Sequence, residues 1–455
     1  MAVTTHDLGT EKISRLLARY ALPAIIAMAS MSLYNIIDSV FIGHAVGAMA
    51  LSGLAISMPI MNIAAALGSM VGIGSAALIS INLGEGKRER TFQILGNLVL
   101  LNITIGLSMM VLSFLFLDKV LILFGASADT LPYARDFMAI ILGGNVVTHL
   151  YMGFNEILRA SGYPQRSMAI MLTAIALTAA LNALFLFGFG WGVRGSALAT
   201  VLAQTCALGL QIAHFSSPKS FLHFRQGIFR LRRVIVGGIL SIGIAPFLLN
   251  LCTSVVVIFV NHALTQTGGD LYVGAYGVLN RVVMFFIFLC AGFNQGMQPI
   301  VGFNYGAKQY DRVVKTLRLT IMCAVCVMTV ACLLGELAPG PIARLFVSSA
   351  DADGAQMIAI SSRAMRFVMM VFPIVGFQIV TSNFFQYIGK PWKAILLSTT
   401  RQLLFLVPLL WILPRSMGST GVWISFPIAD TAATLLAAVL LFYQLRQFKQ
   451  LRTKQ

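Results

Sequence analysis

Charged side chains are scarce in this sequence of 455 residues, of which 10% are charged and 58% are hydrophobic. Acidic residues are the scarcer kind, with 15 Asp and Glu against 32 Lys and Arg, and the mean hydropathy is +0.86. This composition excludes an ordinary soluble domain and is typical of a chain with many membrane spans. The net charge of +17 does not indicate nucleic-acid binding, because the basic residues lie in short loops between apolar runs.

Cysteine is also rare, and the motifs of several enzyme classes are missing. All six cysteines lie inside apolar runs, so we interpret Cys323 and Cys326 as small core residues and not as a metal or redox site. No Walker motif is present, which excludes direct drive by ATP. No Asp-rich, His–Cys or Ser–His–Asp set appears either, so an integral-membrane enzyme is a weak alternative and no cofactor is expected.

Twelve apolar runs are long enough to cross a bilayer, which takes about 20 residues. Six precede a basic amphipathic stretch and six follow it. We therefore predict an all-α integral membrane protein with an N-terminal six-helix lobe (1–215), a cytoplasmic linker (216–233) and a C-terminal six-helix lobe (234–455). The runs lie near residues 16–42, 49–82, 92–117, 131–158, 165–189, 193–215, 234–262, 271–304, 312–336, 357–388, 392–413 and 421–445.

The loop charges predict the orientation of these spans. Of the 32 Lys and Arg residues, 23 lie in the two terminal tails and the loops on the same side, and seven lie in the alternate loops. Positive charge is retained on the cytoplasmic side, so both termini are expected there. The polar N-terminal lead has no short apolar region typical of a cleavable signal, so we expect the first span to be retained.

The two halves of the chain repeat each other at an offset of about 222 residues. The stretches INLGEGKRER (81–90) and FNYGAKQYDR (303–312) are in register, and Pro23 has a counterpart in Pro246. Because each half has an even number of spans, both halves enter the membrane from the same side. We therefore predict a pseudo-two-fold axis along the membrane normal, with a binding cleft between the lobes. The matching residues are Asn82 with Asn304, Gly84 with Gly306 and Arg90 with Arg312.

The first run contains a single carboxylate, Asp38. A charge inside the membrane costs roughly 2.5 kcal/mol or more unless it is paired or hydrated, so Asp38 is a functional candidate. Asn35 and Tyr34 precede it by three and four residues and share its helical face. The alternative is a structural Asp bound to a neighbouring amide. Pro23 removes a backbone hydrogen bond near the start of the helix and provides a point where it can bend.

Asn182 and Thr200 are expected at the same depth as Asp38. We take the nearest glycine of each span as the outer edge of the membrane. At a rise of 1.5 Å per residue, all three residues then lie roughly 7–9 Å below that edge. A carboxylate, an amide carbonyl and a hydroxyl supply the oxygens that an alkali cation prefers. An Asp partly removed from water would equally hold a proton more readily. The residues alone leave Na⁺ and H⁺ both open.

Other polar residues inside the runs have competing interpretations. Asp430 is a candidate second carboxylate, with either a transport role or a salt bridge to Arg401 in the neighbouring span. Glu156 and Arg159, three residues apart, are interpreted as a local ion pair. His149 is interpreted as a core histidine and not as a ligand.

In their order and spacing these features resemble the multidrug and toxic compound extrusion (MATE) transporters. The resemblance implies export of organic cations, driven by Na⁺ or H⁺ moving inward through alternating access. It leads us to expect a monomer in the bacterial plasma (inner) membrane, with cationic small molecules and membrane lipids as partners. It rests on ALP (21–23), Asp38 before FIGH (41–44), the loops 84–90 and 304–312, GYP (162–164), GKP (389–391) and LNALFLFGFGWGVRGSALAT (181–200).

The resemblance also implies a cation site. The family's first-helix Asp and Tyr match Asp38 and Tyr34, its fifth-helix Asn matches Asn182, and its sixth-helix Thr matches Thr200. Many relatives have a second Asp four residues after that Asn, where this chain has Leu186. Because a site with one carboxylate holds Na⁺ less well, we favour the proton.

Two further comparisons follow from the resemblance. Some relatives carry acidic residues in helices seven and ten. This chain has no acidic residue at those positions, so we expect no second site there. The nearest alternative function is a flippase for lipid-linked saccharides of the same superfamily. Such proteins often have extra helices or a more cationic cavity, whereas this chain has twelve predicted spans and a carboxylate.

Overall fold

The computed structural model describes residues 5–45, 48–124, 126–347 and 352–453, and the side chains of residues 35–40 and of most residues from 42 to 55 lie outside it. Within these ranges the regular elements are all helical. Eight helices are long and unbroken: α2 (Ile13–Ala45), α3 (Ala48–Gly84), α4 (Arg88–Leu123), α8 (Gly192–Ser216), α9 (Arg233–Gly268), α10 (Asp270–Gly306), α11 (Tyr310–Leu337) and α17 (Ser419–Thr453).

The remaining spans are composite. The fourth and tenth are bent pairs, and the fifth and eleventh each contain a π-helix, in which the backbone turn is widened by one residue. Two short helices, α1 (Thr5–Thr10) and α12 (Pro339–Arg344), lie outside the spans. The composite spans are α5 (Leu131–Gly143) with α6 (Asn145–Ala160), α7 (Pro164–Ala183) with η1 (Leu184–Gly188), α13 (Ala352–Met369) with α14 (Phe372–Tyr387), and α15 (Pro391–Thr399), η2 (Thr400–Leu406) and α16 (Val407–Met417).

The predicted twelve-span fold is confirmed. In the described ranges, ten helices are long and apolar enough to cross a membrane, and the two bent pairs raise the number to as many as twelve. The angle between α5 and α6 is 55° and that between α13 and α14 is 56°. These pairs are the fourth spans of the two halves, so the same bend recurs at the same place in each repeat.

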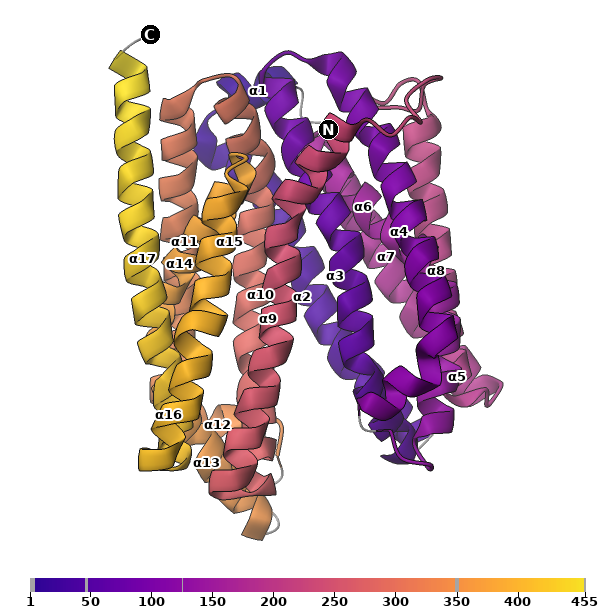
Figure 1. Ribbon diagram of the computed structural model, residues 1–455, viewed down its shortest axis with the longest axis vertical. Coiled ribbons are helices and arrows are strands. Elements are labelled where there is room, and N and C mark those ends of the chain that lie inside the picture. Colours follow the sequence, from indigo (N-terminus) through magenta and orange to yellow (C-terminus); the bar gives the residue numbers. More distant parts are fainter. Residues whose placement is uncertain (1–4, 46–47, 125, 348–351, 454–455) are drawn as a thin grey trace. The chain divides into compact units, whose positions relative to one another are not determined.

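The helices form two compact units. Unit 1 comprises Met1–Glu11, Ile26–Phe247 and Gly302–Lys308, and unit 2 comprises Lys12–Ile25, Leu248–Val301 and Gln309–Gln455. In unit 1 α3 packs against α6 and α4, and α7 against α8; in unit 2 α14 packs against α11 and α17 (Figure 1). Each unit combines segments of both halves of the chain, because parts of α2, α9 and α10 belong to the unit that is formed mainly by the other half.

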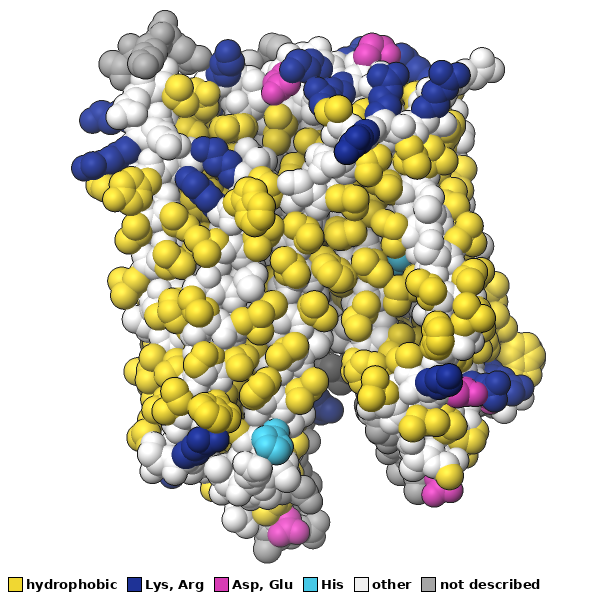
Figure 2. Space-filling view, viewed as in Figure 1, with side chains coloured by type: hydrophobic (Ala, Val, Ile, Leu, Met, Phe, Trp, Pro, Cys, Tyr) yellow, Lys and Arg dark blue, Asp and Glu magenta, His cyan; other side chains and the backbone are white. Residues whose placement is uncertain are grey.

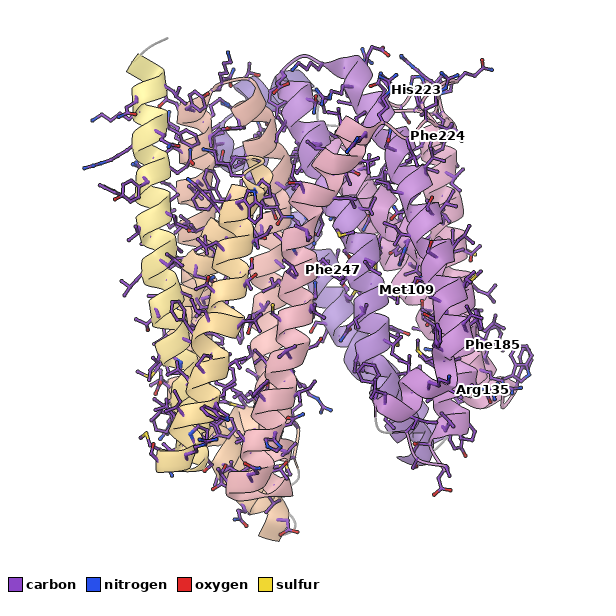
Figure 3. The ribbon with its side chains drawn as sticks, viewed as in Figure 1. Met109, Arg135, Phe185, His223, Phe224 and Phe247 are labelled. Atoms are coloured by element: carbon purple, nitrogen blue, oxygen red, sulfur yellow. The ribbon has the colours of Figure 1, made fainter. Side chains whose placement is uncertain are left out.

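Prolines mark the places where helices pass between the units. Three described helices do so: α2 after Ile25, α9 after Phe247 (labelled in Figure 3) and α10 after Val301. Each crossing follows a proline by one or two residues, namely Pro23, Pro246 and Pro299. Proline removes one backbone hydrogen bond from a helix, so each crossing coincides with a weakened turn.

Close glycine contacts show the repeat inside each unit. In unit 1 Gly74 of α3 lies against the beginning of α9, where an added Cβ would be 2.1 Å from the carbonyl oxygen of Ile239. In unit 2 the repeat-related Gly296 of α10 lies against the beginning of α2, where its Cβ would be 2.7 Å from the Cα of Ala21. In each repeat, therefore, the beginning of the first span packs against the second span of the other repeat.

A reciprocal glycine contact joins the ends of α3 and α10 within unit 1. A Cβ on Gly84 would lie 1.9 Å from the carbonyl oxygen of Phe303, and a Cβ on Gly306 would lie 2.1 Å from that of Ile81. Phe303 and Gly306 are the repeat counterparts of Ile81 and Gly84. Such reciprocity is what a two-fold relation produces, because each partner presents the same surface to the other.

The stretch 216–233 is packed onto unit 1 as an ordered strap, which contains no helix between the end of α8 and the beginning of α9. Asn97 of α4, which is fully buried, donates through Nδ2 to the carbonyl oxygen of Arg230 (3.1 Å) and accepts at Oδ1 from the N–H of Arg232 (2.9 Å). The N–H of Phe224 donates to the carbonyl oxygen of Phe215 (2.7 Å), next to His223 in Figure 3. Both ends of the stretch are thus fixed to α4 and α8.

Exposed charge gathers at the ends of the spans. On the face shown in Figure 2, hydrophobic side chains cover the middle of each unit, and Lys, Arg, Asp and Glu lie toward its two ends. At the end of unit 1 remote from the strap, Arg135 (Figure 3) pairs with Asp118 at 3.3 Å and Arg194 pairs with Asp136 at 2.8 Å. This distribution fits a protein whose middle lies in hydrocarbon.

The reciprocal contact predicts that Gly84→Ala and Gly306→Ala are destabilising to a similar degree. Each added methyl must push a backbone carbonyl aside, and overpacking of this kind costs about 1–3 kcal/mol. Thermal unfolding of the purified protein in detergent measures the effect. Gly209→Ala is the control, since a Cβ there meets nothing within 4 Å. Unchanged unfolding temperatures for both variants would contradict the described packing of α3 on α10.

Candidate cation-coupling site

Two of the predicted site residues are in direct contact. Asn182 lies in the last turn of α7 and is fully buried, and its Nδ2 donates to the hydroxyl oxygen of Tyr34 on α2 at 3.0 Å. The helices that carry them are far apart in the sequence, so tertiary packing within unit 1 brings them together. A buried amide and a phenol hydroxyl placed at this point provide polar groups in an otherwise apolar region.

The π-helix η1 begins two residues after Asn182. Segments of this kind are rare and occur frequently at functional sites, because the extra residue redirects the side chains that follow. Leu186, at the position where many relatives carry a second Asp, is buried inside η1. The next residue, Phe187, meets Phe41 of α2 edge-on, with ring centroids 5.8 Å apart.

The Tyr34 and Phe41 contacts bracket position 38 of α2. Residues 34, 38 and 41 follow the helical spacing i, i+4, i+7 and so fall on one face. Tyr34 and Phe41 both contact the segment 182–187, so this face of α2 is the one that meets α7 and η1. The side chains of Asp38 and Asn35 themselves lie outside the described residues.

Thr200 does not join the hydrogen bond between Tyr34 and Asn182. Its hydroxyl donates to the carbonyl oxygen of Ser196, one turn earlier in its own helix α8, at 3.1 Å. The hydroxyl oxygen keeps acceptor capacity in this arrangement. Participation of Thr200 in cation binding therefore stays a prediction.

Asp430 is paired with Arg401. This salt bridge is the alternative to a transport role that we considered from the sequence. The Nε of Arg401 donates to Oδ1 of Asp430 at 2.6 Å, and the Asp430 side chain is 5% exposed. Arg401 lies in η2, the π-helix of the eleventh span, and Asp430 lies in α17. Pairing satisfies the carboxylate inside unit 2, which favours a structural role over a second coupling site.

The interior of unit 1 contains a second paired carboxylate and a bonded histidine. Glu156 forms an ion pair with Arg159, and Arg159 also donates through Nη1 to the hydroxyl of Ser167 (3.4 Å). His149 is fully buried, and its Nε2 lies 2.9 Å from the carbonyl oxygen of Ala64. These residues have the structural roles interpreted from the sequence.

Sequence reasoning missed the aromatic contact and both π-helices. Phe41 could have been found, because it lies seven residues after Tyr34 and so shares its helical face. The π-helices have no such signal, because one extra residue in a turn leaves the apolar pattern of a fully apolar span unchanged. The interpretation of Cys323 and Cys326 as core residues is wrong for Cys326, which is exposed, and Cys323 is only partly buried.

The structure is thus that of a membrane transporter built from two repeats of six spans. A model of the MatE family matches residues 23–184 and 242–412, one stretch in each repeat. This chain belongs to the MATE family, as the resemblance predicted, and it is therefore a transporter and not an enzyme.

Several known proteins are similar over nearly the whole chain. The multidrug export protein MepA of Staphylococcus haemolyticus is 25% identical over 435 residues, which cover 95% of this chain and 94% of that protein. A solved structure of the MATE multidrug transporter DinF-BH is 36% identical, covers 96% of both chains and has a TM-score of 0.88. An outward-facing MATE family transporter, 22% identical, has a TM-score of 0.91 over 99% of this chain and 100% of its own.

A structural role for the Arg401–Asp430 pair predicts a characteristic mutant cycle. Arg401→Met or Asp430→Leu alone leaves a buried charge without its partner and should cost about 3–5 kcal/mol in stability. The double variant Arg401→Met/Asp430→Leu should recover most of that loss, together with ethidium efflux from cells.

Thermal unfolding and efflux rates measure this cycle. Glu89→Gln is the control, because it breaks the Arg225–Glu89 pair (3.1 Å), whose members are largely exposed, and should have little effect. A double variant that is stable but transports nothing would show that the charges themselves take part in transport.

Proposed function

We propose that this protein exports organic cations in exchange for protons by alternating access, with Asp38 as the coupling residue. The observation that carries the proposal is the bracketing of position 38 by the Tyr34–Asn182 hydrogen bond and the Phe41–Phe187 contact. An intramembrane carboxylate on a helix face lined by a buried amide and a phenol is suited to bind and release a cation. The names of the relatives, a multidrug export protein and a multidrug transporter, support drugs as the exported class.

Leu186 favours the proton over Na⁺ as the coupling ion. Na⁺ needs several oxygen ligands, and Leu186 supplies none at a buried position. The Thr200 hydroxyl donates to its own helix and keeps its acceptor capacity, so it does not decide between the two ions. A proton needs one carboxylate only, and a site that is partly removed from water increases the affinity of that carboxylate for it. Na⁺ held by Asp38, Asn182 and Thr200 is the alternative.

In this proposal the helices that pass between the units bend at their prolines. Alternating access requires the two repeats to open first on one side of the membrane and then on the other. Helix α2 starts in unit 2, passes Pro23 and carries position 38 in unit 1. Protonation of Asp38 is then linked to the bend of α2 at Pro23. The loop charges support a cytoplasmic position for both termini and for the strap 216–233.

Proton coupling predicts that a pH gradient alone drives transport of ethidium into or out of proteoliposomes prepared without Na⁺. Asp38→Asn should abolish this transport, because an amide carries no proton at neutral pH, and it should leave folding unchanged. Asp118→Asn is the control, since Asp118 is a half-exposed carboxylate at the end of a span, paired with Arg135. Transport that depends wholly on Na⁺ and ignores the pH gradient would refute proton coupling.

The hinge predicts slower efflux for Pro23→Ala and Pro246→Ala. Alanine restores the missing backbone hydrogen bond and stiffens the crossing between the units, while Asp38 stays in place. Efflux rates and their pH dependence in cells measure the effect. Pro427→Ala is the matched control, because Pro427 lies inside α17, which stays within unit 2. Normal turnover in both proline variants would refute the proposed hinge and would not affect the assignment of Asp38.

A further inference from the structure

Two lysines at one end of unit 2 share a neutral acceptor. Lys390 precedes α15 and Lys393 lies in its first turn, and the Nζ atoms of both donate to Oε1 of Gln444 on α17, at 2.7 and 3.2 Å. Lys390 also donates to Oε1 of Gln447 at 3.3 Å. Two ammonium groups thus converge on one amide oxygen, which brings like charges close together.

No carboxylate among the described residues pairs with either lysine. The described ion pairs involve other residues, and the remaining neighbour of Lys393 is the Phe385 ring, whose centroid is 5.1 Å from its Nζ. Burial, and then the charge of Lys393, lower the pKa of Lys390. Each ammonium has three N–H donors, so donors remain for an anionic oxygen.

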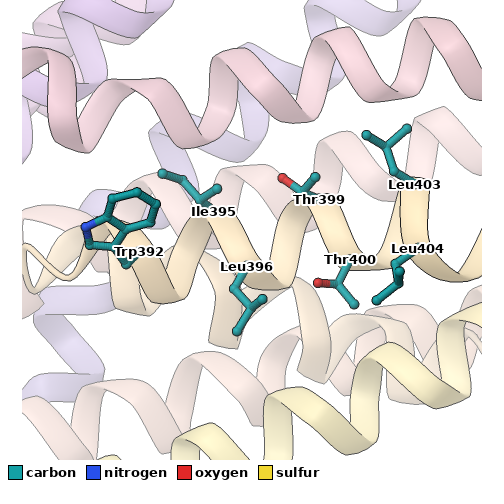
Figure 4. A pocket seen from close by; sticks show the side chains of 7 residues that line it. All are labelled: Trp392, Ile395, Leu396, Thr399, Thr400, Leu403 and Leu404. Atoms are coloured by element: carbon teal, nitrogen blue, oxygen red, sulfur yellow. The ribbon is translucent and has the colours of Figure 1, made fainter.

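An apolar groove of about 600 Å³ begins beside these lysines. It follows α15 and η2 from Trp392 to Leu404, and its seven lining side chains are apolar except for Thr399 and Thr400 (Figure 4). Leu404 lies twelve residues beyond Trp392, which at a rise of 1.5 Å per residue gives a length of roughly 18 Å. That length matches one leaflet, since the hydrocarbon core of a bilayer is about 30 Å thick.

Trp392 stands at the junction of the charged and apolar parts. Its side chain is 81% exposed, and Leu404 at the far end is 65% exposed. Tryptophan in membrane proteins concentrates at the boundary between headgroups and hydrocarbon. The lysines therefore lie at headgroup level and the groove lies in the acyl region below them.

We propose that Lys390, Lys393 and this groove form a binding site for one anionic phospholipid. The headgroup phosphate accepts hydrogen bonds from the two Nζ atoms, and one acyl chain lies along α15 and η2 from Trp392 to Leu404. A soluble anion would satisfy the lysines and leave the groove unused, whereas a phospholipid matches both parts. The loop charges predict that this end is cytoplasmic, so the proposed lipid belongs to the inner leaflet.

Native mass spectrometry of the full-length protein with added phosphatidylglycerol tests the lysines. Lys390→Gln/Lys393→Gln should weaken binding about 30-fold, as expected for two basic residues facing anionic lipid. Arg415→Gln is the matched control, because Arg415 also lies beside a tryptophan (3.9 Å from the Trp411 ring) but at the other end of the same span. Unchanged affinity in the double variant would overturn the proposal. If that variant does not fold, Lys393→Gln alone should weaken binding about fivefold.

A second variant tests the groove separately from the charges. Thr399→Trp should fill the groove and displace the acyl chain, and so reduce phosphatidylglycerol binding while both lysines remain. Inorganic phosphate should fail to displace the lipid when added in equal amount. Full binding in Thr399→Trp, or displacement by phosphate, would show that the lysines hold a soluble anion and would also overturn the proposal.

Discussion

The constraint on which this structure depends is the absence of hydrogen-bond partners in hydrocarbon. A lipid bilayer cannot solvate a backbone N–H, a carboxylate or a guanidinium, so each buried polar group must find its partner within the protein. The backbone satisfies this constraint by forming helices throughout the spans. The buried side chains satisfy it in pairs, as Arg401 with Asp430, Glu156 with Arg159, and Asn182 with Tyr34. The helix pairings of each unit are therefore fixed partly by where these few polar residues fall.

The same constraint gives glycine and proline opposite roles. Hydrocarbon offers no hydrophobic driving force between helices, so close backbone approach at small residues supplies much of the packing. Gly74, Gly84, Gly296 and Gly306 provide that approach at related positions in the two repeats. Proline instead weakens a helix at a defined turn, and Pro23, Pro246 and Pro299 do so where helices pass between the units. Glycine thus determines where the helices make close contacts, and proline determines where they can bend. Both residue types can be read directly from the sequence.

Much of the fold could be predicted because membrane spans have a strong sequence signal. Run lengths gave twelve spans, and the motifs at 81–90 and 303–312 gave the repeat. The Arg401–Asp430 pair was offered as an alternative, since both residues are charged and lie in neighbouring spans. The exchange of helix segments between the units could not be predicted, because it depends on which surfaces fit and not on hydropathy. The π-helices η1 and η2 were missed for a similar reason, since they change the backbone turn and not the composition.

The packing of the strap bears on how the proposed motion is transmitted. A connection between two repeats is an obvious candidate for a flexible link, but Asn97 binds two backbone groups of 216–233 and fixes the stretch to α4. The strap therefore moves with unit 1. The connections left to bend include the helices that cross between the units, and α2 is the one that also carries Asp38. The proposed coupling by this carboxylate needs no long pathway in such an arrangement, because the residue proposed to bind the ion and the turn proposed to bend belong to the same helix, about four turns apart.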